Sequence, residues 1–111
     1  MVTDEEIIVE INKLRDKLTD ENLAKHFKSW NKTMQYYFPD IDTYWHLTMV
    51  NGQPGEPIKG KYDNPEIGYE ITTEDFFALN RGEISGLKLF NQKRLKIKAS
   101  MPDILKLQKL N

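Results

Sequence analysis

The 111-residue sequence contains no cysteine. This absence excludes a disulfide framework, thiolate zinc ligands and catalysis by a nucleophilic thiol, and it is compatible with a reducing compartment. Histidine is also scarce, since only His26 and His46 occur, and neither stands at a spacing typical of metal ligands. We therefore expect no bound metal ion.

Long apolar runs are absent as well. No segment approaches the roughly 18 consecutive apolar residues of a membrane-spanning helix. The N-terminal residues Met-Val-Thr-Asp-Glu-Glu are acidic and lack the apolar core of a secretory signal. The terminal tripeptide Lys109-Leu110-Asn111 does not match a peroxisomal address. These features predict a cytoplasmic protein.

Signatures of catalysis are few. No glycine-rich phosphate loop occurs, and the serines lack the context of a nucleophile elbow. The pair Glu74-Asp75 has the chemistry of an acid and a base, but the capping and first-turn charge of a helix explain both residues better. We expect no enzymatic activity and no cofactor. A lyase or isomerase would require an Asp or Glu buried inside a pocket.

Charge is unevenly distributed along the chain. Residues 1–85 carry 9 basic and 16 acidic side chains, whereas residues 86–111 carry 7 basic side chains against Asp103 alone, and the net charge is −1. This distribution predicts one basic side, which we expect to touch an anionic membrane transiently. Alternating Arg94, Lys96 and Lys98 would also suit nucleic acid. Alternating cations more often form the wet face of a strand, so we expect no nucleic-acid partner.

Hydrophobic periodicity divides the first half of the chain into helices and strands. Apolar residues at steps of three and four predict an amphipathic helix over residues 4–18. A second helix is expected over about 20–30, capped by an aspartate. Aromatic and alternating residues predict strands over 33–38 and 43–50, and Asn51-Gly52 is a turn signal that ends the second strand.

The second half is expected to alternate between strands and short helices. Residues 53–57 read as a loop, because they contain two prolines and a glycine. The remaining elements are expected, in chain order, as an edge strand near 58–62, a strand over 67–71, a helix from Thr72 or Thr73 to Gly82, a helix over about 84–90, a strand over 94–99 and a final helix from Ser100.

The order of these elements resembles the sterol carrier protein type-2 family of lipid-binding domains. The resemblance covers the chain from about Leu23 and is strongest over residues 69–101. The matching segments are Tyr44-Trp45-His46-Leu47 with Asn51-Gly52, Tyr69-Glu70-Ile71-Thr72, Asp75-Phe76-Phe77-Ala78-Leu79 with Gly82, Leu89-Phe90, Arg94-Leu95-Lys96-Ile97 and Met101. Lys93 and Ala99 stand where the family usually has glycine. A positive φ at Lys93 would be strained by up to about 1–2 kcal/mol, so we expect this turn to be shaped differently from the family's.

The resemblance implies an α/β (α+β) fold with one domain over residues 1–111. It implies a mostly antiparallel sheet of about five strands backed by helices, with an apolar tunnel between sheet and helices that the C-terminal helix closes. It also implies a non-enzymatic role, the binding and transfer of lipids such as fatty acids, fatty acyl-CoA, phospholipids or sterols.

The resemblance assigns a lipid-binding role to the apolar surplus of the C-terminal third. We expect the ligand chain to lie against Phe76, Phe77, Ile84, Leu87, Phe90, Leu95, Ile97, Met101, Ile104, Leu105 and Leu107. The polar end is expected at the tunnel mouth, near a cation such as Lys106 or Lys109. Taken by themselves, these apolar residues could equally well fill a closed core. The alternative is therefore a closed-core scaffold or interaction module for a partner protein, without a lipid ligand.

Overall fold

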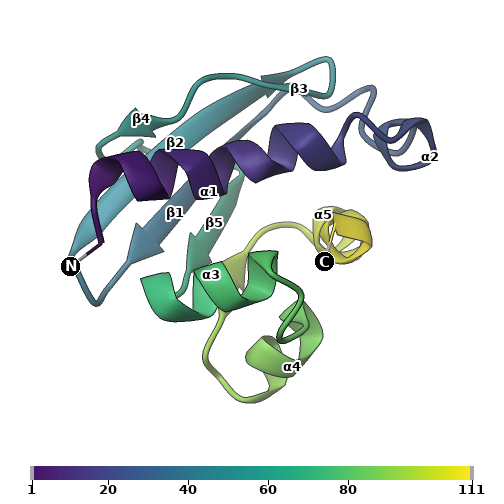
Figure 1. Ribbon diagram of the computed structural model, residues 1–111. Coiled ribbons are helices and arrows are strands. Elements are labelled where there is room, and N and C mark those ends of the chain that lie inside the picture. Colours follow the sequence, from purple (N-terminus) through teal and green to yellow (C-terminus); the bar gives the residue numbers. More distant parts are fainter. Residues whose placement is uncertain (1, 111) are drawn as a thin grey trace.

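The computed structural model describes residues 2–110, so Met1 and Asn111, the last residue of the terminal tripeptide, lie outside it. One sheet is covered on one face by helices (Figure 1). The helices are α1 (Asp4–Lys17), α2 (Glu21–Ala24), α3 (Thr73–Asn80), α4 (Gly86–Asn91) and α5 (Met101–Leu107), which runs into a 3-10 turn (Gln108–Leu110). The strands are β1 (Lys32–Phe38), β2 (Thr43–Val50), β3 (Gln53–Pro54), β4 (Ile58–Lys59), β5 (Ile67–Glu70) and β6 (Lys96–Lys98).

The sheet is mixed and mostly antiparallel, which confirms the predicted fold class. Its order is β3-β2-β1-β5-β6, and β4 also pairs with β2. Only β1 and β5 run parallel among the paired strands of residues 2–110, because the chain crosses the sheet between them. The prediction missed β3, which pairs with β2 through Gln53 and Pro54. A proline is tolerated there because the strand lies at an edge.

The first helix follows its sequence signals. Thr3 caps α1 in a capping box with Glu6, and the acidic first turn lies at the positive end of the helix dipole. Ile7, Ile11 and Leu14 form the buried stripe that packs over the sheet. The predicted helix over 20–30 is wrong in length, since α2 ends at Ala24 and turns continue to residue 29.

Tertiary contacts explain why α2 is short. Phe27 and Trp30 are buried, with their rings in an edge contact at 4.9 Å between centroids. The Gly52 amide donates to the Trp30 carbonyl at 3.0 Å, and the backbone of Gly52 passes so close to Phe27 that a Cβ there would lie 2.4 Å from its carbonyl oxygen. The Trp30 carbonyl therefore serves the turn after β2, while the amides of His26, Phe27 and Trp30 donate to carbonyls three residues earlier, a pattern of turns and not of a continuing α-helix.

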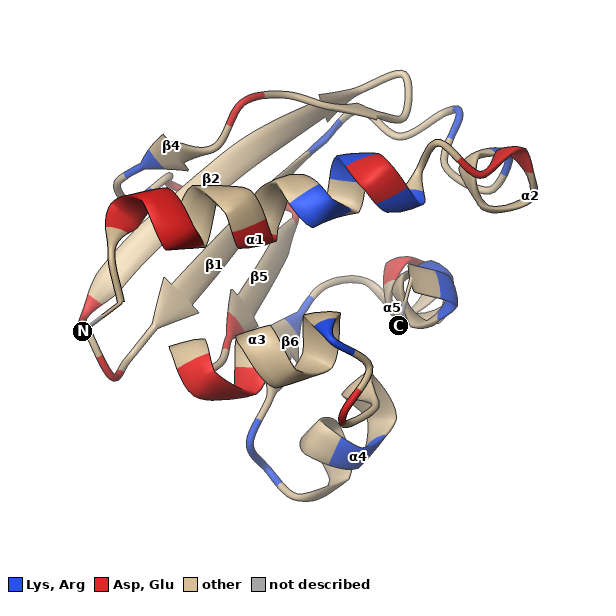
Figure 2. Ribbon diagram, in the orientation of Figure 1, with Lys and Arg blue, Asp and Glu red and all other residues tan. Residues whose placement is uncertain are grey.

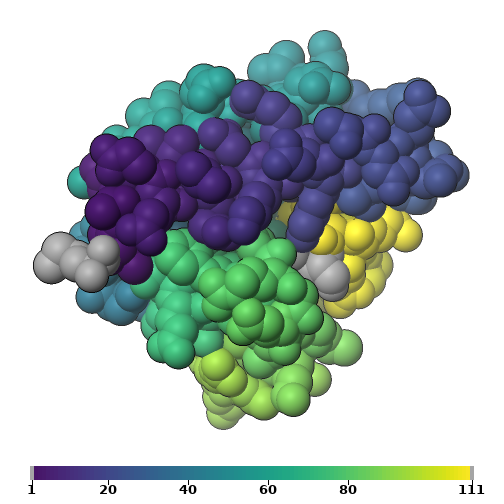
Figure 3. Space-filling view, viewed as in Figure 1, coloured from purple at the N-terminus to yellow at the C-terminus, as the bar shows by residue number. Residues whose placement is uncertain are grey.

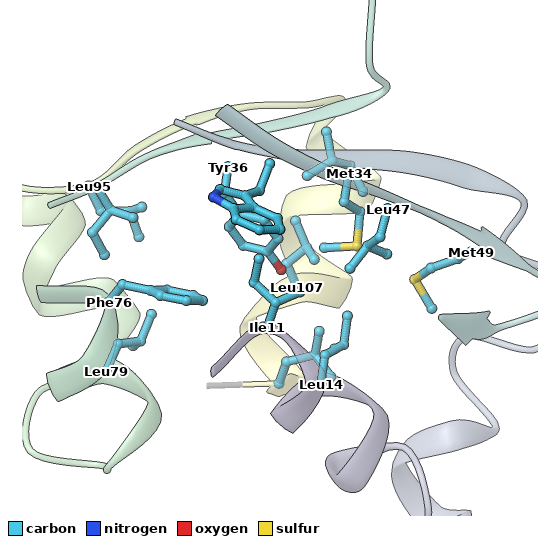
Figure 4. Close-up of a cluster of buried hydrophobic side chains, with 14 of the residues drawn as sticks. Ile11, Leu14, Met34, Tyr36, Leu47, Met49, Phe76, Leu79, Leu95 and Leu107 are labelled. Carbon is cyan, nitrogen blue, oxygen red and sulfur yellow. The ribbon is translucent and has the colours of Figure 1, made fainter. Parts of the chain in front are cut away.

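The alternation predicted for two strands is confirmed. Trp45, Leu47 and Met49 of β2 are buried on the helix-covered face of the sheet, where Figure 4 shows Leu47 and Met49 among the core side chains. The residues around β6 also alternate: Leu95 is buried, and Lys96 and Lys98 are exposed. The β6 ladder is nevertheless shorter than the predicted 94–99.

The turn before β6 keeps a left-handed residue at Lys93, so the expectation of a differently shaped turn is wrong. The φ of Lys93 is +61°, a value that glycine adopts at lower cost than lysine. The adjacent Arg94 guanidinium donates to both Asp75 carboxylate oxygens, at 2.6 and 3.2 Å, and so joins this turn to α3. Among residues 2–110, no helix is both long and apolar enough to cross a bilayer.

Candidate functional site

A cavity of about 560 Å³ lies between α4, α5 and the β5–β6 edge of the sheet. Its volume falls within the roughly 300–1,000 Å³ typical of small-molecule sites. The lining residues are Tyr69, Ser85, Gly86, Leu87, Phe90, Asn91, Leu95, Ile97, Met101, Ile104, Leu107 and Gln108. In the space-filling view, the α3–α4 segment (green) lies below α1 (purple), and the α5 segment (yellow) lies to the right of the green segment (Figure 3).

Most of the residues predicted to contact a ligand line this cavity. They are Leu87, Phe90, Leu95, Ile97, Met101, Ile104 and Leu107. Steps of three place the α5 members on one helix face, and strand alternation turns Leu95 and Ile97 to the inner face of the sheet. The structure therefore brings together, from three separate elements, side chains that the sequence could only group by their apolar character.

Four predicted residues do not line the cavity. Phe76 is buried in the main core, with its ring 5.3 Å from those of both Tyr36 and Phe38, and Figure 4 shows it beside Leu79. The partly buried Phe77 and Ile84 pack against the same core. Leu105 is 56% exposed, because its position on α5 points away from the face that carries Ile104.

Sequence reasoning missed the polar residues of the lining. These are Tyr69, Ser85, Asn91 and Gln108, together with the backbone of Gly86. Inward alternation along β5 was a usable signal for Tyr69, and Gln108 follows Ile104 by one helical turn. Ser85 and Asn91 stand at the two ends of α4, where only the placement of that helix turns them toward the cavity.

Large exposed hydrophobic side chains surround the cavity. Leu87, Phe90, Met101 and Leu105, from α4 and α5, are between 49% and 66% exposed, and the first three also line the cavity. We call these four residues the mouth patch. Scattered exposed apolar residues are ordinary, whereas a gathering beside an apolar cavity marks a site of contact with a ligand or partner.

No charged side chain lines the cavity within residues 2–110. The expected cations Lys106 and Lys109 lie elsewhere, with Lys106 Nζ 5.9 Å from the centroid of the Trp30 ring. Partial burial lowers the pKa of His26, and the nearby charges of Lys109, Lys25 and Lys106 lower this pKa further. Lys106 of α5 and Lys109 of the 3-10 turn therefore lie near His26 and outside the cavity lining. Figure 2 shows the basic residues of α5 in blue.

The buried carboxylates are also outside the cavity. Asp75 is paired with Arg94, and Asp103 accepts two hydrogen bonds from Lys32 Nζ. Neither carboxylate belongs to the cavity lining in the described part of the chain. The buried Asp or Glu that a lyase or isomerase would require is therefore not part of that lining. In residues 2–110, no group of three or more histidine, aspartate or glutamate residues is arranged to hold a metal ion.

A smaller recess of about 40 Å³ lies deeper in the core, beside α1. Its polar lining residues are Glu10, Lys17, Tyr36, Tyr69 and Asn80. Glu10 contacts Lys13 Nζ at 2.7 Å and Asn80 Nδ2 at 3.0 Å, and Lys17 Nζ donates to the Leu110 carbonyl at 2.7 Å. Tyr69 lines both the recess and the cavity.

Solved structures with the same fold include both single domains and larger enzymes. The sec-alkylsulfatase Pisa1 from Pseudomonas sp. aligns at 14% identity and TM-score 0.71 over 96% of this chain but only 16% of its own. Sterol carrier protein 2 like 2 from Aedes aegypti aligns at 10% identity and TM-score 0.69 over 95% of both chains. The UbiJ-SCP2 ubiquinone synthesis protein aligns at 11% identity and TM-score 0.67 over 99% of this chain and 92% of its own.

These identities are low, so the structural likeness establishes the fold alone. The Aedes protein has also been solved in a palmitated form, which aligns at 12% identity and TM-score 0.67 over 91% of this chain and 89% of its own. No curated protein matches the chain. The profile of the SCP-2 sterol transfer family matches residues 11–111, which is nearly the whole sequence. The chain therefore belongs to the SCP-2 sterol transfer family.

Proposed function

We propose that this chain acts as a single lipid-binding domain that carries a lipid without transforming it. The observation that carries the proposal is the cavity of about 560 Å³, whose lining is mostly apolar and contains no charged side chain within residues 2–110. Family membership supports the same role. The palmitated form of the Aedes protein supports a fatty acyl chain as one class of occupant.

The energetic scale suits a carrier. Burial of one methylene contributes about 0.8 kcal/mol, so eight methylenes contribute roughly 6 kcal/mol before the cost of association. A free energy of 6 kcal/mol corresponds to a dissociation constant of roughly 40 μM even without that cost, so micromolar binding requires a longer buried alkyl chain. A carrier benefits from this range, because a much tighter complex would release its lipid slowly.

The α5 helix is the proposed lid. Met101, Ile104 and Leu107 form one wall of the cavity, and the helix contains only residues 101–107 before the final 3-10 turn. A short helix outside the sheet opens at lower cost than a strand within the hydrogen-bonded ladder. Ligand entry between α4 and α5 would then leave the sheet and α1 undisturbed.

A binding titration with paired variants tests the proposal. Leu87 lines the cavity and is 58% exposed, so Leu87→Glu places a charge at the wall without unfolding the core. Val9 on α1 is 60% exposed and lies outside the cavity lining, so Val9→Glu is the matched control. With Nile red as an uncharged fluorescent probe, we expect saturable binding by the wild type and Val9→Glu, and at least tenfold weaker binding by Leu87→Glu. No binding by folded wild-type protein at micromolar concentration would refute the proposal.

The mouth patch supports a docking role during lipid exchange. We propose that it contacts an anionic bilayer, because exposed apolar side chains stand here on a C-terminal part rich in lysine. Leu105 is the informative position, since it is exposed but does not line the cavity. Leu105→Glu should reduce sedimentation with phosphatidylserine vesicles while leaving the binding of Nile red unchanged. If neither Leu105→Glu nor added salt reduces the fraction of protein bound to vesicles, the docking role is contradicted.

The same patch also suits the second candidate, a scaffold that binds a partner protein. Its supporting observation is the mouth patch itself, which a partner would bury as well as a bilayer would. Native mass spectrometry of freshly purified protein separates the two functions. A carrier arrives with lipid-sized adducts that denaturation removes, whereas a closed-core scaffold shows the bare mass of the chain or of a protein complex.

A further inference from the structure

Two tyrosine hydroxyls in the interior have no protein partner. Tyr36 and Tyr69 face each other across the parallel β1–β5 pair, with their rings stacked 5.3 Å apart at 8°. Within residues 2–110, neither hydroxyl forms a hydrogen bond, although Tyr36 is only 7% exposed. Neither hydroxyl oxygen is fully enclosed, since Trp45 Nε1 is the one fully buried side-chain polar atom without a partner among residues 2–110. A hydroxyl that is open to an internal space can be satisfied there by water or by a ligand oxygen.

The two hydroxyls differ in what can reach them. Tyr36 lines the small recess alone, where about 40 Å³ is enough space for water. Figure 4 shows its ring extending from the sheet toward Leu107 and Ile11. Tyr69 lines both the recess and the large cavity, so a molecule in the cavity can reach Tyr69 but not Tyr36. The other polar lining residues of the cavity, Ser85, Asn91 and Gln108, are exposed at its outer side.

The charge of the cavity limits the kind of group that Tyr69 can meet. Burial raises the pKa of the Tyr69 hydroxyl well above its usual value, so the group remains a neutral donor. No lysine or arginine lines the cavity in the described chain, and a buried carboxylate or phosphate would therefore lack a counter-charge. An uncharged acceptor such as an alcohol, ketone or ester oxygen carries no such penalty.

We propose that the cavity selects lipids whose polar end is a small uncharged oxygen group, and that this oxygen accepts a hydrogen bond from Tyr69 at the inner wall. The alkyl part then runs outward past Ile97 and Ile104 to the mouth patch. This orientation is opposite to one in which the head remains at the mouth beside a cation. The inference rests on the proposed function, because it assumes that a lipid occupies the cavity.

Displacement of Nile red by three ligands of equal chain length tests the inference: dodecane, 1-dodecanol and dodecanoate at pH 7.5. For the wild type, we expect 1-dodecanol to bind at least tenfold more tightly than dodecanoate. Tyr69→Phe should weaken 1-dodecanol by about fivefold to tenfold, the scale of one hydrogen bond, and leave dodecane within twofold. Tyr37→Phe is the matched control, because Tyr37 donates to Asp42 and lines neither space.

Each contrary result has a separate meaning. Equal weakening of dodecane and 1-dodecanol by Tyr69→Phe, or a loss in Tyr36→Phe alone, overturns the assignment to Tyr69. Wild-type binding of dodecanoate as tight as that of 1-dodecanol overturns the selectivity while leaving the carrier function intact. Displacement by none of the three ligands overturns both proposals. Thermal unfolding verifies the variants, since removal of an unpartnered hydroxyl should leave the melting temperature unchanged or higher.

Discussion

Lys32 Nζ donates to both carboxylate oxygens of Asp103, each at 2.7 Å, and thereby joins the start of β1 to the first turn of α5. The Asp103 side chain is 8% exposed and that of Lys32 is 29% exposed, so the pair is shielded from solvent on one side. The Ser100 side chain caps the same turn by accepting from the Asp103 amide. This ion pair is a polar anchor of the proposed lid, together with the Lys17 bond to the Leu110 carbonyl just after α5.

Removal of the charge at Asp103 should loosen α5. Asp103→Asn leaves the Lys32 ammonium without its counter-charge, and we expect a loss of about 2 kcal/mol in the free energy of unfolding, below the cost for a fully buried pair. Urea denaturation measures this loss, and amide exchange should be faster in α5 than in β1. The exposed pair Lys96–Glu70 supplies the control, since Lys96→Met should change stability by less than about 0.5 kcal/mol. A similar loss in both variants would argue against an anchoring role.

Replacement of Lys93 by glycine should stabilise the folded protein. Its φ of +61° strains a side chain that glycine lacks, so Lys93→Gly should raise the free energy of unfolding by up to about 1 kcal/mol after the greater chain entropy of glycine is counted. Asn64 also has a positive φ, at +56°, but asparagine tolerates this region, so Asn64→Gly should change stability by only a few tenths. Chemical denaturation of both variants gives the comparison, and a loss of stability in Lys93→Gly would be the contrary result.

Gly52 should tolerate no side chain. Its φ is +79°, and an added Cβ would lie 2.4 Å from the Phe27 carbonyl oxygen. Gly82 has a similar φ of +74° but open space around it. Gly82→Ala should therefore cost about 1–2 kcal/mol for the backbone alone, and Gly52→Ala should cost at least about 1 kcal/mol more for the clash. Thermal or urea unfolding measures the difference. Equal losses of stability in the two variants would mean that the backbone around Phe27 shifts to accommodate the added Cβ.

Alkaline pH should destabilise the protein through its buried tyrosines. Burial raises the pKa of Tyr36 and of Tyr69 above their usual values. The unfolded chain therefore loses these protons first, at about pH 10, and the free energy of unfolding falls as the pH rises from there. Each tyrosine contributes a slope of up to about 1.4 kcal/mol per pH unit. Tyr36→Phe should reduce the slope of the unfolding free energy against pH by the contribution of one tyrosine, as measured by urea denaturation between pH 9 and 11. An unchanged slope would show that Tyr36 does not contribute to it.

Local patterns were sufficient for most elements and for one wall of the cavity. Alternation along β2 and β6, the capping residues of α1 and α3, and the three-residue steps of Met101, Ile104 and Leu107 all depend on near neighbours in the chain. Patterns among near neighbours were therefore enough to predict the order of all elements except β3, the inward faces of the strands and the family.

Only the tertiary structure decided which apolar residues fill the core and which line a cavity. Phe76 and Leu87 have equivalent signals in sequence, but α3 packs its phenylalanine against Tyr36, whereas α4 lies away from the sheet and leaves Leu87 beside open space. The shortness of α2 and the absence of cations from the cavity were likewise decided by contacts between distant residues, such as Gly52 with Phe27 and Lys106 with Trp30. Periodicity shows which way a side chain points along its own element, but whether another element fills the space it faces depends on how the elements pack.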